Sequence, residues 1–224
     1  MLSLAPALAL LLSAANPESL CDQIRTPTQP AAGELTRGEE VHATPGSAGR
    51  PRLYEYTNSG VESQYQYNAC GQAAVSTVLT ALGIKPEDPT DAVMKEVYKR
   101  FPPDILFGKF GTSWMRFQKA LKGYGASYRW LEGEQSLRSV IASGGLAVVM
   151  LDVGATQDEG WGSIGAHWTV IYAYDTDGVF LSNWPRDGKC TWANLRRGWD
   201  TQLTRAFYGA PPWQSHQWIV VPGR

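Results

Sequence analysis

A cysteine and a glutamine six residues apart are of the types that cleavage of an amide by a thiol requires. Cys70 stands directly before a run of small and apolar residues, 71–82, which predicts a buried helix. The unpaired N–H groups and the positive dipole end of a helix stabilise a thiolate and a developing oxyanion. Gln64 precedes the helix and is expected to donate a second hydrogen bond to that oxyanion, with Gln66 and Asn68 as nearby competitors.

A base is also needed, because a free cysteine thiol has a pKa near 8.5 and is mostly protonated at neutral pH. The chain has three histidines. His42 lies before the predicted domain and His216 lies in a polar turn, whereas His167 opens an apolar strand after the glycine-rich loop 160–166. His167 is therefore the predicted general base.

A third group should orient the imidazole. Asn183 follows the apolar run 179–182, across a predicted hairpin from His167, and its carbonyl oxygen is expected to accept a hydrogen bond from one ring nitrogen. Asp175 and Asp177 are alternatives, but they fall in the turn of that hairpin, where aspartate before glycine is typical of the turn itself. The competing interpretation of Cys70 is a buried small hydrophobic residue.

Composition favours one globular domain, and the charge of the chain does not indicate a strongly charged binding partner. The 224 residues are 43% hydrophobic and 18% charged with a net charge of −1, so nothing indicates a nucleic-acid partner. The three cysteines, Cys21, Cys70 and Cys190, lack the spacing of a zinc site, and no cofactor is expected. Because the number of cysteines is odd, one possible pairing is a disulfide between Cys21 and Cys190 with Cys70 as a free thiol.

The chain begins with segments that differ from the rest. Residues 2–15 are almost wholly apolar, over a length that suits a signal peptide and is too short to span a bilayer, although no basic residue precedes Arg25. We expect a signal peptide or an apolar helix over 1–15, a flexible linker rich in Pro, Thr and Gly over 16–50, and a folded domain over 51–224. Such a chain would be secreted or in the cell envelope, with no membrane-spanning segment in its mature form.

Periodicity predicts helices first and strands afterwards. The helices are expected over 70–82, 92–99, 114–122 and 134–143, and the strands over 146–153, 167–174, 179–182 and 218–221. This order favours an α+β fold with an N-terminal helical layer packed on a C-terminal antiparallel sheet.

These motifs resemble those of a known family. Gln64-x5-Cys70-Gly71 followed by an alanine-rich helix is similar to papain-like cysteine peptidases of the bacteriocin-leader-processing (double-glycine) type and their stand-alone bacterial relatives. The similarity continues to His167-Trp168 and the hairpin before Asn183, over roughly residues 55–185. It implies a papain-like cysteine peptidase fold, with Cys70 as nucleophile, His167 as base and acid, Gln64 in the oxyanion hole and Asn183 at the orienting position.

Two residues depart from the family's pattern. The family often has Asp-Pro where this chain has Asn183-Trp184-Pro185, and Gln72 replaces a proline often found after Cys-Gly. The predicted activity is hydrolysis of peptide bonds in a protein or peptide substrate through a thioester on Cys70. The alternatives are a transglutaminase-like acyltransferase on the same two residues and a non-catalytic peptide-binding domain of the same fold.

Overall fold

The computed structural model describes residues 42–43, 55–156, 165–184, 188–208 and 217–223. The predicted segment 1–15 and nearly all of the predicted linker 16–50 lie outside these residues. Among the described helices, none is long and apolar enough to cross a membrane.

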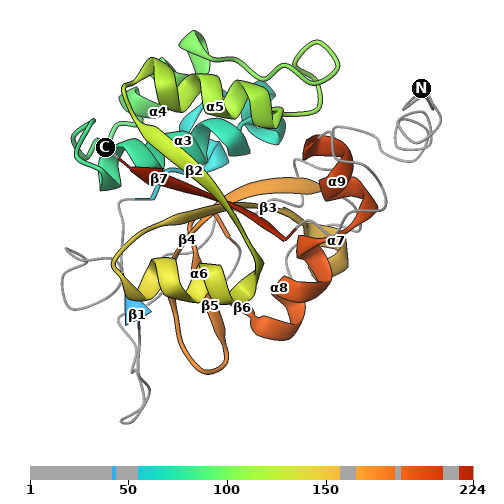
Figure 1. Cartoon of the computed structure of the whole chain (residues 1–224). Coiled ribbons are helices and arrows are strands. Elements are labelled where there is room, and N and C mark those ends of the chain that lie inside the picture. Colours follow the sequence, from blue (N-terminus) through green and yellow to red (C-terminus); the bar gives the residue numbers. More distant parts are fainter. Residues whose placement is uncertain (1–41, 44–54, 157–164, 185–187, 209–216, 224) are drawn as a thin grey trace.

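An antiparallel sheet with strands of different lengths forms the centre of the molecule (Figure 1). Its strands follow the order β2-β7-β3-β4-β5-β6, and β1 pairs with the far end of β4. Their bounds are β1 His42–Ala43, β2 Ser127–Glu132, β3 Ala147–Asp152, β4 Ala166–Tyr174, β5 Gly178–Leu181, β6 Lys189–Thr191 and β7 Trp218–Gly223.

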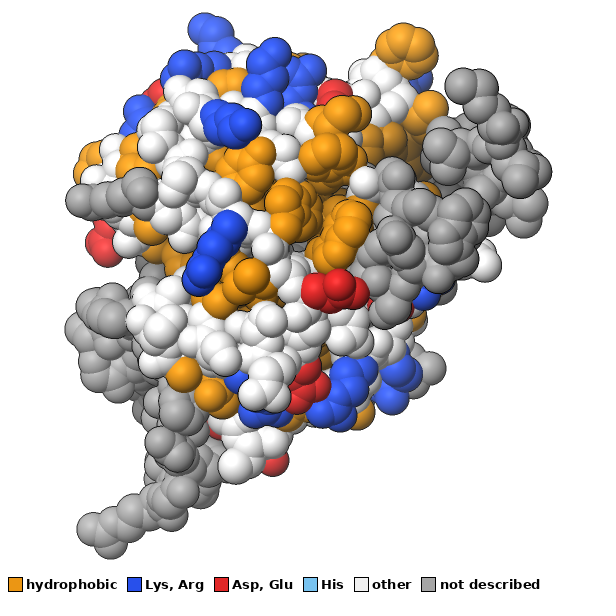
Figure 2. All heavy atoms as spheres, in the orientation of Figure 1, with side chains coloured by type: hydrophobic (Ala, Val, Ile, Leu, Met, Phe, Trp, Pro, Cys, Tyr) orange, Lys and Arg blue, Asp and Glu red, His pale blue; other side chains and the backbone are white. Residues whose placement is uncertain are grey.

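Helices cover both faces of this sheet, one group above it and one below in Figure 1. The upper group contains η1 Asn58–Gly60, η2 Ser63–Asn68, α3 Cys70–Ala81, α4 Ala92–Arg100 and α5 Trp114–Gly123. The remaining helices are α6 Gly133–Ala142, α7 Val153–Thr156, α8 Trp192–Trp199 and α9 Gln202–Tyr208. Lys119 and Lys122 of α5 are exposed in the helical layer, over which Lys and Arg side chains gather (Figure 2).

The predicted α+β architecture, with N-terminal helices packed on an antiparallel sheet, is confirmed. The eight predicted helices and strands are all present, with ends that differ by a few residues. The second helical group, formed around α6 and α8, was not anticipated as a layer. It explains why β3 is apolar on both sides, since Ala147, Val149 and Leu151 pack on this second group while Val148 and Met150 face the first.

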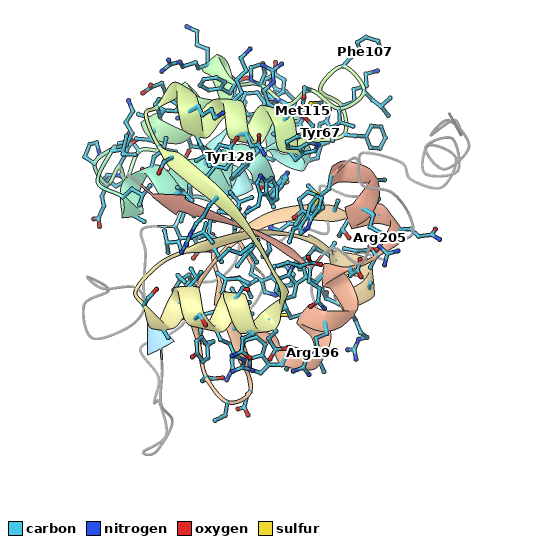
Figure 3. All side chains as sticks on the ribbon, viewed as in Figure 1. Tyr67, Phe107, Met115, Tyr128, Arg196 and Arg205 are labelled. Atoms are coloured by element: carbon cyan, nitrogen blue, oxygen red, sulfur yellow. The ribbon has the colours of Figure 1, made fainter. Side chains whose placement is uncertain are left out.

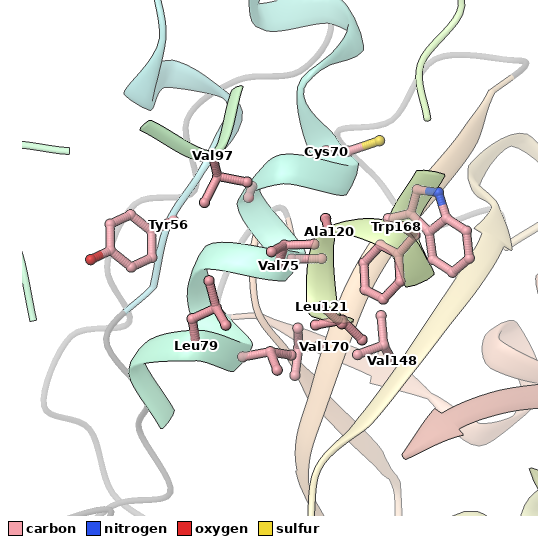
Figure 4. Packing of buried hydrophobic residues seen from close by; sticks show 14 of the residues in the cluster. Tyr56, Cys70, Val75, Leu79, Val97, Ala120, Leu121, Val148, Trp168 and Val170 are labelled. Carbon is pink, nitrogen blue, oxygen red and sulfur yellow. The ribbon is translucent and has the colours of Figure 1, made fainter. Parts of the chain in front are cut away.

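Trp168 of β4 joins the sheet to the upper helices (Figure 4). Its ring stacks on Phe117 of α5 with centroids 4.8 Å apart, and its indole N–H donates to the Thr112 carbonyl over 2.8 Å. Val75 and Leu79 of α3 belong to the same buried cluster. Helix α3 and the start of α5 are thereby packed against β4.

Gly71 allows the first turn of α3 to approach the segment before α5. A Cβ atom at this position would lie 2.6 Å from Cβ of Thr112 and 2.7 Å from its Oγ1, closer than such atoms pack. Thr112 is itself held, because its hydroxyl donates to Oε1 of Gln72, and Nε2 of Gln72 donates to the Phe101 carbonyl. Packing therefore requires the glycine, and the buried Gln72 connects α3 to the loops around it.

We predict that Gly71→Ala lowers the free energy of unfolding by about 1–3 kcal/mol, because overpacking displaces Thr112. Urea denaturation measures the loss. In a Thr112→Gly background, which removes all three crowded atoms, the same substitution should cost less. An equal cost in both backgrounds would contradict the proposed contact.

Candidate active site

Cys70 is the first residue of α3, and only 7% of it is exposed. Its sulfur lies near the backbone N–H groups of Trp168, Gly71 and Cys70 itself. Burial raises the pKa of the thiol, and these three donors lower it without cancelling the effect of burial. The resting sulfur is therefore a thiol, since the helix N-terminus does not stabilise a thiolate enough to offset burial.

His167 is 3% exposed on β4, where it lies opposite Leu151 of β3. Its Nε2 lies 2.8 Å from the backbone carbonyl oxygen of Asn183. A carbonyl only accepts, so Nε2 carries the proton of the neutral ring and Nδ1 keeps its lone pair. Burial lowers the pKa of His167 to about 4, although the bond to Asn183 acts in the opposite direction. The imidazole is thus neutral at pH 7 and retains one basic nitrogen.

The strand geometry brings the sulfur to the peptide bond between His167 and Trp168. Further along β4, Val170 accepts from Ser182 N–H over 2.9 Å, so its backbone groups face β5. Trp168 lies two residues earlier and therefore presents its N–H to the same side. The Cys70 sulfur lies close to that N–H, which lowers the pKa of the thiol. The Cys70 sulfur therefore lies beside the peptide unit that joins His167, the predicted base, to Trp168.

The two side chains reach this point from different faces of the sheet. Trp168 packs in the cluster beneath α3 and α5, whereas the His167 ring lies 6.0 Å from that of Trp184, which belongs to the cluster around α8. Alternation along the strand places neighbouring side chains on opposite faces. Cys70 thus approaches from the upper helices, and His167 is held from below.

Asn183 orients His167 through a different atom from the one predicted. The expected acceptor was the side-chain carbonyl, but the structure places the backbone carbonyl on Nε2. The side chain is occupied elsewhere, since Nδ2 donates to Oδ1 of Asn58 over 2.8 Å and Oδ1 accepts from Asn58 N–H. Asn183 has a φ of 51°, a left-handed conformation that asparagine tolerates better than most residues. Its N–H donates to the carboxylate of Glu55.

The alternative acids remain in the hairpin turn. Asp175 accepts from the N–H groups of Asp177 and Gly178 and pairs with Lys189 at 2.6 Å. Asp177 lies 3.6 Å from the same lysine. Both carboxylates serve the turn, as the sequence pattern had indicated.

The three candidate oxyanion donors differ in their surroundings. Gln64 is exposed, and its Nε2 donates to the Glu62 carboxylate over 2.6 Å. Gln66 donates to the Val61 carbonyl, and the buried Asn68 donates to the Gly108 carbonyl. The described structure does not bring Gln64 into contact with Cys70, so its role in the oxyanion hole stays a prediction.

Exposed apolar side chains lie on the helical layer near η2. Phe107 is 99% exposed and Met115 is 61% exposed, and Figure 3 shows both in the same region as Tyr67 of η2. Asn68 connects η2 to the loop that carries Phe107, through the Gly108 carbonyl. Tyr67 belongs to the segment that leads into Cys70, and the loop of Phe107 is bonded to it through Asn68. Met115 lies in the same region.

Sequence reasoning missed Asn58, Glu55 and the N–H of Trp168. Asn58 and Glu55 precede Cys70 and contact Asn183, over 120 residues away in the chain, so no local spacing signals the contact. The Trp168 contribution comes from the backbone, which carries no residue-type signature. The Trp168 side chain, next to His167, was the one available hint.

The remaining cysteines and histidines add no further site among the described residues. Within these residues, no cluster of three or more His, Cys, Asp or Glu side chains is arranged to hold a metal ion. Cys190 is buried on β6, but Cys21 lies outside the described residues, so their pairing stays a prediction. His216 also lies outside them.

Comparisons with known proteins give distant structural likenesses only. No protein-family model matches the chain, and no curated protein matches its sequence. Among solved structures, a protein from Bacillus anthracis, provisionally described as a C39-like peptidase, superposes with a TM-score of 0.48 and 14% identity. The match covers 70% of this chain and 90% of that one. A likeness of this size carries no conclusion about activity.

We predict that acid destabilises the protein through His167. Its pKa of about 4 in the folded chain compares with 6.5 for an exposed histidine, so the unfolded chain binds more protons between these values. Stability is then fully present above pH 6.5 and is lost as the pH falls towards 4. Lowering the pH from 7 to 5 should reduce the free energy of unfolding by about 2 kcal/mol, measured by urea denaturation.

The matched variant is His167→Gln, which has no titrating ring. Its stability should change much less between the same two pH values. Equal losses in the wild type and the variant would show that the His167 ring is not held neutral.

Proposed function

We propose that this chain is a papain-like cysteine peptidase that cleaves peptide bonds in a protein or peptide through a thioester on Cys70. One observation carries the proposal. The Cys70 sulfur contacts the N–H of the peptide unit that follows His167, and the His167 ring is oriented by Asn183 with Nδ1 left as its basic nitrogen. A secreted or cell-envelope location is part of the same proposal.

The reaction starts from two neutral groups. As the Cys70 sulfur attacks the scissile carbonyl carbon, its proton passes to Nδ1 of His167, and the resulting imidazolium stays bonded to the Asn183 carbonyl. The negative oxygen of the tetrahedral intermediate is stabilised by N–H groups at the start of α3, an effect of roughly 3 kcal/mol for one donor. Gln64 supplies a further donor once its side chain leaves Glu62.

Collapse of the intermediate gives an acyl-enzyme. The carbon–nitrogen bond breaks, and the proton on His167 moves to the leaving amine. His167 then takes a proton from water, which attacks the thioester and restores the thiol. Transfer to an amine in place of water would be the acyltransferase version of the same chemistry.

A second candidate is a non-catalytic peptide-binding domain. The burial of Cys70 favours it, because burial raises the pKa of the thiol and leaves little of its surface exposed. A neutral thiol is nevertheless compatible with catalysis when the base accepts the proton during attack. The peptidase proposal therefore depends on His167 and not on a preformed thiolate.

We predict that the wild type cleaves peptide bonds and that Cys70→Ala and His167→Ala do not. The measurement is proteome-wide cleavage-site profiling of an unfolded protein mixture, in which new N-termini are identified by mass spectrometry. Gln64→Ala should retain cleavage with kcat about a hundredfold lower, the cost of one oxyanion donor.

Matched controls separate chemistry from folding. Cys190→Ala, also a buried cysteine but on β6, should keep the wild-type cleavage pattern. New N-termini that persist with Cys70→Ala would contradict the proposal. Products that appear only with an added amine would favour acyl transfer.

A further inference from the structure

Asn58 contacts both halves of the candidate site. It lies in η1, only 4% exposed, and its Oδ1 accepts from Nδ2 of Asn183 over 2.8 Å while its own N–H donates to Oδ1 of Asn183 over 3.3 Å. Its remaining group, Nδ2, donates to the Gln66 carbonyl over 2.7 Å. One side chain therefore joins Asn183 to the η2 segment that leads into Cys70.

Each contact acts on a different catalytic group. The Asn183 side chain is held by two hydrogen bonds, which fix the residue whose backbone carbonyl orients His167. The Gln66 carbonyl belongs to η2, which ends at Asn68, two residues before Cys70. A shift of Asn58 would consequently move the imidazole and the sulfur relative to one another.

The atoms of an asparagine are needed at this place. Oδ1 must accept from one amide and Nδ2 must donate to a carbonyl, and only a primary amide offers both in one short side chain. Aspartate has the same shape but cannot donate to the Gln66 carbonyl. Alanine removes both contacts and leaves the Asn183 amide and the Gln66 carbonyl without them.

We propose that Asn58 is a positioning residue that sets the distance between Cys70 and His167, a role that rests on the proposed peptidase function. It touches neither the substrate nor the reacting atoms, and it acts through Asn183 on one side and through η2 on the other. Its loss should affect the chemical step more than the binding of substrate.

The test compares Asn58→Asp and Asn58→Ala with the wild type, using cleavage of a fluorescent casein and alkylation of Cys70 by iodoacetamide, located by mass spectrometry. We expect kcat to fall about tenfold to a hundredfold with KM changed by less than about twofold, because misplacement slows the chemical step. The alkylation rate at pH 7 should approach that of His167→Ala. Should the buried carboxylate of Asn58→Asp prevent folding, the neutral Asn58→Ala supplies the result.

Ser59→Ala is the matched control, since Ser59 is the next residue of η1, is exposed, and contacts only Thr57 through its described hydroxyl bond. It should behave as the wild type in both assays. A lowered melting temperature with wild-type kcat and alkylation rate in Asn58→Ala would overturn the inference and leave the peptidase proposal standing.

The alkylation assay also works without any substrate. If the wild type cleaves nothing, the peptidase proposal fails, while an alkylation rate in Asn58→Ala equal to that of His167→Ala and different from wild type still supports the positioning role. Identical alkylation in the wild type, Asn58→Ala and His167→Ala would overturn the positioning role itself.

Discussion

Trp168 is the residue on which the arrangement of the site depends. Its ring stacks on Phe117, and its indole N–H binds the Thr112 carbonyl, so the strand is fixed to the upper helices. Its backbone N–H meets the Cys70 sulfur. Because the ring and the backbone of one residue make these contacts, the helix that carries the thiol and the strand that carries His167 are held in one relative position.

A second constraint comes from the backbone at Asn183. A left-handed residue turns the chain away from β4 and presents its carbonyl to Nε2 of His167. The acceptor is then a main-chain atom, and the side chain is free to bond Asn58. The orientation of the imidazole therefore does not rely on a charged side chain at this position.

Burial determines the protonation of the two reactive groups. It raises the pKa of Cys70 and lowers that of His167, so both changes favour the neutral pair over the thiolate and imidazolium. Helix-end donors oppose the first shift without overcoming it. In the mechanism we propose, the proton therefore passes from the thiol to His167 during attack, and the placement of Nδ1 matters more than the acidity of the thiol.

Side-chain patterns predicted the parts of this structure that depend on residue type. The small and apolar residues of 71–82 predicted α3, and the run at 167–174 predicted β4, because burial of most of a helix or strand leaves a pattern in the sequence. Strand β2 was missed because it is short and contains no buried residue, so the alternation of Tyr128 and Trp130 with polar neighbours is a weak signal.

Contacts made by the backbone could not be predicted in the same way. The Trp168 N–H and the Asn183 carbonyl are backbone groups, which nearly every residue has. Residue identity therefore does not show which of them will be used in a site. Asn58 was missed because its partner lies 125 residues away, and only the folded chain brings them together.

The central claim is that Cys70 and His167 act as a pair held by Trp168 and Asn183. A crystal structure of the chain with a peptide aldehyde tests it most directly. The account predicts a hemithioacetal on the Cys70 sulfur, with its oxygen on N–H groups at the start of α3, Nδ1 of His167 beside the sulfur, and Nε2 still on the Asn183 carbonyl. An unmodified Cys70, or a His167 ring turned so that Nδ1 faces away from the adduct, would contradict it.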